Sequence, residues 1–172
     1  MTKKYKLTEK YVERFGVKLF QIQALVAFGT VVAGELGGYI ESEECLSHSG
    51  NAWVSGEALV YGDAQVSGDA QVYGDAHVSG DTQVFGNARV YDDAWVSGNV
   101  RVSGDALVYG SARVYGNARV YGNARVYDDA WVSGNARVFG NARVYGSAQV
   151  SGNVRVSGDA LVYGNARVYD VR

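Results

Sequence analysis

The chain has 172 residues with a formal net charge of −2 at pH 7, and it contains 23 glycines and 13 tyrosines but no proline. This composition argues against a mixed globular fold and favours a repetitive β architecture with glycine-dependent turns. The single cysteine, Cys45, excludes an internal disulfide. The charge is uneven, because residues 50–85 carry five acidic and no basic residues, whereas residues 86–172 carry ten Arg and seven Asp.

Residues 1–49 contain no repeat. The apolar segment at 17–33 is interrupted by Lys18, Gln21 and Gln23, so neither a signal peptide nor a membrane-spanning helix is expected, and we predict a cytoplasmic protein with no membrane partner. Residues 3–7 and 17–26 alternate as strands do, while residues 8–14 allow a short helical turn. We expect residues 1–49 to form an N-terminal β cap on the next domain.

From Gly50 to Tyr169 the chain divides without insertion into twenty hexads, each reading Gly, Asn or Asp, Ala, any residue, Val, Tyr or Ser, with few exceptions. In a short strand the Ala and Val of one hexad share one face. The Gly and the Asn or Asp suit a corner, because they tolerate positive φ. A strand of four residues cannot bury its own apolar face, so the hexads must stack as a solenoid.

Deviations from the repeat give the size of one coil. The stretch DDAWVSGN occurs at 92 and at 128, which are 36 residues apart, and NVRVSGDALVYG occurs at 99 and at 153, which are 54 apart. The largest spacing that divides both is 18, or three hexads. Residues 50–172 are therefore predicted to form one triangular parallel β-helix of nearly seven coils.

The hexads resemble those of the hexapeptide-repeat left-handed β-helix superfamily over residues 50–169. The resemblance implies an all-β, single-stranded, left-handed parallel β-helix. Residues 36–54 are further similar to a group of bacterial and phage proteins that are labelled acyltransferases by homology. This second resemblance implies, as one alternative, an acyltransferase that uses acetyl-CoA and a histidine general base.

The only histidines are His48 and His77. His77 is the first candidate for a general base, because Asp75 lies two residues earlier, and His48 is the second. No hexad carries an insertion that could shelter an acyl donor, and the two histidines cannot supply the three zinc ligands of the superfamily's carbonic anhydrases. We therefore expect no catalytic residue, cofactor or metal, and a non-enzymatic role.

Stacking every 18 residues aligns outward side chains into columns. One column contains six tyrosines from Tyr73 to Tyr163, and a mixed column runs from Trp95 to Arg167. Arginines at the spacing of neighbouring strands repel one another unless corner aspartates, counterions, an acidic protein or nucleic acid neutralises them. Nucleic acid is disfavoured by the acidic hexads at 56–85. The candidate binding residues are Arg101, Arg119, Arg137, Arg155, Trp95, Trp131, Tyr109, Tyr127 and Tyr145.

After the hexad at 164–169 only three residues follow, which are too few to cover a coil. An uncovered β edge favours pairing, so we predict a homo-oligomer, with an end-to-end dimer first and a lateral trimer second. The charges of Asp170 and Arg172 offer the alternative of a monomer. The predicted function is a non-catalytic structural or protein-interaction solenoid, phage- or mobile-element-encoded and acting on a host protein. The residues predicted to self-associate are Val168, Tyr169, Asp170, Val171 and Arg172.

Overall fold

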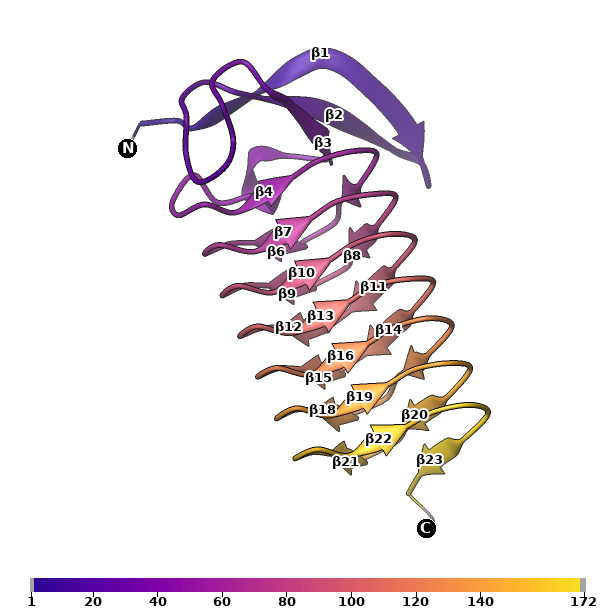
Figure 1. Cartoon of the computed structure of the whole chain (residues 1–172). Helices are drawn as coiled ribbons and strands as arrows, with labels where there is room; N and C mark the ends of the chain where they lie inside the picture. Colours follow the sequence, from indigo (N-terminus) through magenta and orange to yellow (C-terminus); the bar gives the residue numbers. More distant parts are fainter. Residues whose placement is uncertain (1, 171–172) are drawn as a thin grey trace.

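The hexads form a three-sided parallel β-solenoid, with the N-terminal segment across one end (Figure 1). The computed structural model describes residues 2–170. Three sheets run along the solenoid, and each coil contributes one short strand to each sheet. The coil of eighteen residues is confirmed, because Arg101 pairs with Arg119 and Trp95 with Arg113 in parallel register. The left-handed sense remains an expectation of the resemblance.

The long sheet contains ten strands, which are β1 (Tyr5–Arg14), β2 (Val17–Ala24), β3 (Leu36–Ile40), β5 (Leu59–Val60), β8 (His77–Ser79), β11 (Trp95–Gly98), β14 (Arg113–Gly116), β17 (Trp131–Val132), β20 (Gln149–Ser151) and β23 (Arg167–Tyr169). The tyrosine sheet contains seven strands, which are β4 (Trp53–Val54), β7 (Gln71–Val72), β10 (Arg89–Val90), β13 (Leu107–Val108), β16 (Arg125–Val126), β19 (Arg143–Val144) and β22 (Leu161–Val162). The arginine sheet contains six strands, which are β6 (Gln65–Val66), β9 (Gln83–Val84), β12 (Arg101–Val102), β15 (Arg119–Val120), β18 (Arg137–Val138) and β21 (Arg155–Val156).

The core is a single column of Ala and Val, as the alternation within each hexad predicts. Val78, Val120 and Val138 are fully buried, as are Ala118 and Ala136. Full burial of a valine side chain contributes roughly 1.5–3 kcal/mol relative to exposure, so the stacked hexads stabilise one another far more than any single hexad could stabilise itself.

Positive φ and close backbone contact both favour glycine at the corners. Gly140 has a φ of 71°, and a Cβ there would lie 2.9 Å from the backbone nitrogen of Gly158 in the next coil. Asp92 and Asp128 occupy the same kind of position at a φ of 58°. Each compensates with its carboxylate, since Asp92 Oδ2 accepts the N–H of Gly110 at 3.2 Å.

The N-terminal segment closes the first coils. Strands β1 and β2 form an antiparallel hairpin, β2 pairs antiparallel with β3, and β3 joins the parallel stack by pairing with β5. A short 3-10 helix, η1 (Glu43–Cys45), follows. The helical turn expected at residues 8–14 is wrong, because these residues belong to β1, where Val12 pairs with Leu19.

Two buried side chains bind the cap to the solenoid. Lys4 Nζ donates to Ala52 O at 2.7 Å, and burial lowers the pKa of this ammonium to about 8. The Tyr5 hydroxyl donates to Leu46 O at 2.6 Å, and burial raises the pKa of the phenol. Both bonds satisfy backbone oxygens at the start of the solenoid, which is the task of a cap.

The opposite end is open within the described residues. Strands β21, β22 and β23 are the last strands of their sheets, and Val162 and Val168 are only partly buried, in contrast to the earlier valines. Tyr163 and Tyr169 are 59% and 60% exposed. Across residues 2–170 no helix has the length and apolar character needed to span a membrane.

Candidate functional site

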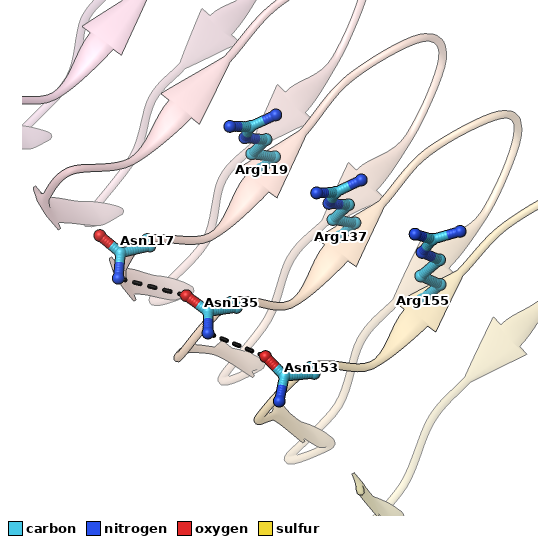
Figure 2. A pocket seen from close by; sticks show the side chains of 6 residues that line it. All are labelled: Asn117, Arg119, Asn135, Arg137, Asn153 and Arg155. Atoms are coloured by element: carbon cyan, nitrogen blue, oxygen red, sulfur yellow. Dashed lines mark hydrogen bonds between the residues drawn. The ribbon is translucent and has the colours of Figure 1, made fainter.

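The arginine column lies on the outer face of the arginine sheet. Valine fills the inward slot of each hexad, so the residue before it points outward. Strand pairing places Arg101, Arg119, Arg137 and Arg155 directly beside one another on β12, β15, β18 and β21. Figure 2 shows the last three guanidiniums extending in the same direction from successive coils.

A ladder of asparagines runs beside these arginines. Asn117 Nδ2 donates to Asn135 Oδ1 at 3.2 Å, and Asn135 Nδ2 donates to Asn153 Oδ1 at 2.8 Å (Figure 2). Asn153 Nδ2 in turn donates to Asp170 Oδ2 at 3.1 Å. A side-chain amide has two N–H groups and two acceptor lone pairs, so each central asparagine keeps one N–H and one lone pair for a ligand.

The two ladders line one open groove, which we call the arginine–asparagine groove. Its volume is about 370 Å³, and its lining residues are Asn117, Arg119, Asn135, Arg137, Asn153 and Arg155. All six side chains are polar, and each type repeats once per coil, or about every 4.8 Å. The groove therefore offers the same pair of groups, a cation and an amide, at regular intervals.

Among residues 2–170, no carboxylate forms an ion pair with the arginine column. Within residues 2–170 the ion pairs closer than 4.0 Å are Lys3–Glu43 and His48–Glu43, neither of which involves this column. The corner aspartates suggested from the sequence therefore do not neutralise it. Neighbouring guanidiniums about 4.8 Å apart repel each other by roughly 1 kcal/mol in a water-like medium, and salt reduces this value.

The residue types at the corners of the hexads account for the absence of these ion pairs. In every hexad whose outward residue is Arg, the corner two positions earlier is Asn or Ser, as in Asn117 before Arg119 and Ser111 before Arg113. Where the corner is acidic, the outward residue is Leu, Gln, His or Trp. This pairing is a signal that the column-by-column reading of the sequence missed, and it keeps an acid out of the hexad that carries each guanidinium.

An aromatic ladder follows the same strands on the other side of the arginines. The rings of Tyr121 and Phe139 stack with centroids 4.9 Å apart and an interplanar angle of 1°. These two rings cover each other's facing surfaces. They support neighbouring strands, and Tyr121 also lines a cavity of about 240 Å³ together with Phe85, Arg101, Ser103 and Arg119.

The tyrosine column is a continuous stack. Tyr109 and Tyr127 are confirmed on the same side, with centroids 4.9 Å apart and an interplanar angle of 2°. Tyr145 continues the stack at 5.0 Å from Tyr127. Burial raises the pKa of Tyr109 and of Tyr127. Because both faces of each of these rings lie against neighbouring tyrosines, this column contributes mainly to the stability of the sheet.

The mixed column forms a second groove on the long sheet, of about 400 Å³. Arg113 lies over the ring of Trp131 with its guanidinium carbon 5.3 Å from the centroid, which is a cation–π contact. Trp95 stacks instead on His77, with centroids 4.6 Å apart. Both tryptophans remain more than a third exposed.

His77 packs against other aromatic side chains and does not face a groove. Its ring stacks on Trp95 and meets the ring of Phe15 edge-on with centroids 5.6 Å apart, and its buried Nδ1 has no hydrogen-bond partner among the described residues. Asp75 therefore does not orient the ring through that atom. Burial lowers the pKa of His77 below its ordinary value, and the charge of Asp75 opposes this shift.

His48 lies in the cap, far along the chain from His77. Its ring stacks on Tyr5 at 4.2 Å between centroids, and its Nδ1 accepts the backbone N–H of Lys4 at 3.3 Å. Its Nε2 lies 3.4 Å from Glu43 Oε2. These contacts join the end of the cap to its start at Lys4 and Tyr5.

The remaining predicted residues lie at the open end. Val168 and Tyr169 belong to β23, which pairs with β20, and Asp170 accepts the amide of Asn153. Val171 and Arg172 lie outside the described residues. No group of three His, Cys, Asp or Glu side chains within residues 2–170 is arranged to hold a metal ion.

Fold and surface together define a capped parallel β-solenoid with polar and aromatic ladders. Comparison with family models agrees, because the model described as YdcK beta solenoid repeat matches overlapping segments that together span residues 64–163, more than half of the chain. The chain therefore belongs to the YdcK β-solenoid repeat family. A comparison with curated proteins finds none that matches it. The matched segments are 64–80, 70–85, 82–98, 94–110, 100–116, 112–127, 118–134, 130–146, 136–150 and 148–163.

Proposed function

We propose that this protein is a non-catalytic interaction scaffold that joins a second copy through its last coil and binds a ligand along its side. The observation that carries the first part is the open end of the solenoid. There, core residues such as Val162 and Val168 are only partly buried, and three strands have a neighbour on one side only within residues 2–170. Such an edge is a template for a further strand.

The hydrogen-bond pattern indicates how two ends would meet. Arg143 N–H donates to Ala160 O at 2.9 Å and Gln149 N–H donates to Ala166 O at 2.8 Å, each toward the next coil. The equivalent N–H groups of the last coil are those of Leu161 and Arg167. In a twofold dimer β22 would lie antiparallel to its partner's β22, so the two Leu161 residues would exchange both backbone bonds.

Proline substitution tests this interface without touching the core. Leu161→Pro combined with Arg167→Pro removes the two backbone N–H donors that point away from the last coil and keeps the backbone carbonyls of both residues. Light scattering at tens of micromolar should find two chains per particle for the unchanged protein and one for the proline variant. Leu161→Ala with Arg167→Ala is the matched control, since it keeps both N–H groups and should remain dimeric.

A monomeric unchanged protein would overturn the dimer. A trimer that is insensitive to the proline substitutions would instead support lateral packing of whole prisms, which is the second arrangement expected from the sequence. Circular dichroism of each variant verifies that the solenoid is intact.

We also propose that these repeats are left-handed hexapeptide repeats. Support comes from the uninterrupted hexads and from the three-sided coil of eighteen residues. Vibrational or electronic circular dichroism calibrated on solenoids of both hands would test the sense.

A further inference from the structure

We propose that the arginine–asparagine groove binds a linear acidic polysaccharide of the polyuronate class, with one carboxylate per sugar ring. This inference rests on the proposal that the side of the solenoid is a binding surface, and it adds the chemistry of the ligand. The groove favours an anionic ligand, because its arginines have no carboxylate within 4.0 Å among residues 2–170 and every arginine-bearing hexad has a neutral corner.

Spacing selects among linear polyanions. The guanidiniums repeat about every 4.8 Å, the distance between paired strands. An acidic β-strand presents side chains on one face only every ~6.6 Å, and an acidic helix presents a stripe with a pitch of ~5.4 Å. One strand of duplex DNA carries a phosphate every ~3.4 Å of helix axis. None of these spacings keeps step with the four arginines of the column.

A uronic acid chain comes nearer to this spacing. One hexose ring with its glycosidic oxygen is longer than one nucleotide step along a duplex and shorter than two residues of a strand, so its length lies near one strand spacing of about 4.8 Å. Carboxylates that face the groove at each ring meet every arginine, and carboxylates that face it at every second ring meet alternate arginines. Guanidinium and carboxylate form paired, charge-assisted hydrogen bonds, which suit Arg better than Lys.

The asparagine ladder fits the rest of such a ligand. Each of Asn135 and Asn153 uses one N–H and one lone pair within the ladder and has one of each left for sugar hydroxyls. A nucleic acid would gain little stacking inside this groove, because its lining side chains are all Asn or Arg. The two ladders together therefore match a ligand that repeats both a carboxylate and hydroxyls.

The length of the ligand gives a first test. Fluorescently labelled oligouronates of two, four and six rings are titrated with the full chain, and binding is followed by fluorescence anisotropy. Affinity should rise steeply from two rings to four, which is enough to span the three arginines that line the groove, and then only slightly. The same oligomers with their carboxylates reduced to alcohols should not bind.

Matched variants locate the site. Arg137→Gln should weaken tetramer binding about tenfold, the loss expected for a charge-assisted hydrogen bond, and Arg137→Lys should weaken it less. The variant should fold, because Gln occupies the same slot at Gln65 and Gln83. Arg143→Gln removes an equal charge from the tyrosine sheet and should leave binding unchanged.

Asn135→Asp adds a repelling charge to the groove with little change in shape. Asp is compatible with the accepting position of such a ladder, since Asn141 Nδ2 donates to Asp159 Oδ1 at 2.9 Å on another corner, but it removes the bond that Asn135 Nδ2 donates to Asn153 Oδ1. We expect this variant to lose tetramer binding by at least about tenfold, as for the removal of an arginine.

The outcomes separate this inference from the proposed function. An equal loss on Arg137→Gln and Arg143→Gln, or equal binding of the reduced oligomers, overturns the groove as a polyuronate site. If oligouronates do not bind, but an oligonucleotide or an acidic polypeptide binds and Arg137→Gln weakens that binding, the surface is functional and only the ligand class is wrong. If none of these probes binds, both the ligand and the binding surface are refuted.

Discussion

Replacing a corner glycine by alanine tests the close stacking of the coils. Gly140 and Gly158 occupy the same corner of successive coils, with φ of 71° and 63°. An alanine at either position would have to adopt a left-handed backbone conformation, which lowers the stability of the fold by about 1–2 kcal/mol. Only at Gly140 would the new Cβ also meet the next coil, 2.9 Å from the nitrogen of Gly158, whereas nothing lies within 4 Å of it at Gly158.

The two variants should therefore differ in the stability of their own coils. Overpacking against backbone costs about 1–3 kcal/mol, so Gly140→Ala should be destabilised by that amount more than Gly158→Ala. This corresponds to a factor of between about five and about 150 in hydrogen-exchange protection. The reporters are the amides of Asn123 and Asn141, which donate to Gly140 O and Gly158 O, both at 2.8 Å.

Equal losses of protection in the two variants would refute the argument, because they would mean that no backbone of a following coil limits the space at Gly140. The comparison uses the Leu161→Pro and Arg167→Pro background, so that a second copy does not cover Gly158. Urea unfolding followed by tryptophan fluorescence verifies that the rest of the solenoid is unaffected.

Two further predictions concern His77. Burial lowers its folded pKa, so protonation favours the unfolded chain, and His77 should stabilise the fold above pH 6.5 and lose this contribution as pH falls below it. His77→Gln, which copies Gln83, should flatten the pH dependence of urea unfolding between pH 7 and 5, and an unchanged slope would contradict the packing argument. Acetyl-CoA should not raise the melting temperature of the unchanged protein; a rise that His77→Ala abolishes would favour the acyltransferase alternative.

The solenoid could be predicted from the sequence because its repeat is compatible with only one register of strand pairing. A shift of one residue would turn Val120 outward and Arg119 inward, so burial alone selects the observed pairing of Arg119 with Arg137. The stacking of Tyr109 on Tyr127 follows directly from that register.

The cap could not be predicted to the same degree, because long-range contacts decide it. Residues 8–14 form a strand since they pair with β2, and no local pattern announces this partner. Phe15 turns the hairpin at a φ of 53°, which is unusual for an aromatic residue. Its ring stacks on Tyr61 and lies against His77, and those contacts join residues far apart in the sequence.

The groove was predictable in part. The alignment of Arg101 to Arg155 follows from the period of eighteen, and the pairing confirms it. The asparagine ladder required the observation that corners also stack, so that Asn117 meets Asn135. The preference for Asn or Ser before each arginine was present in the sequence and becomes meaningful only when both columns are viewed together.

Because each of the four coils from Asn99 to Arg155 supplies one arginine and one asparagine to this face from a block of eighteen residues, the number of such blocks sets how many sugar rings the proposed site can hold. Unequal recombination within the gene could add or remove fifty-four nucleotides at a time and so lengthen or shorten the recognised polymer by one ring. Selection for longer ligands would then act on the number of copies of this block of fifty-four nucleotides and would require no new type of side chain.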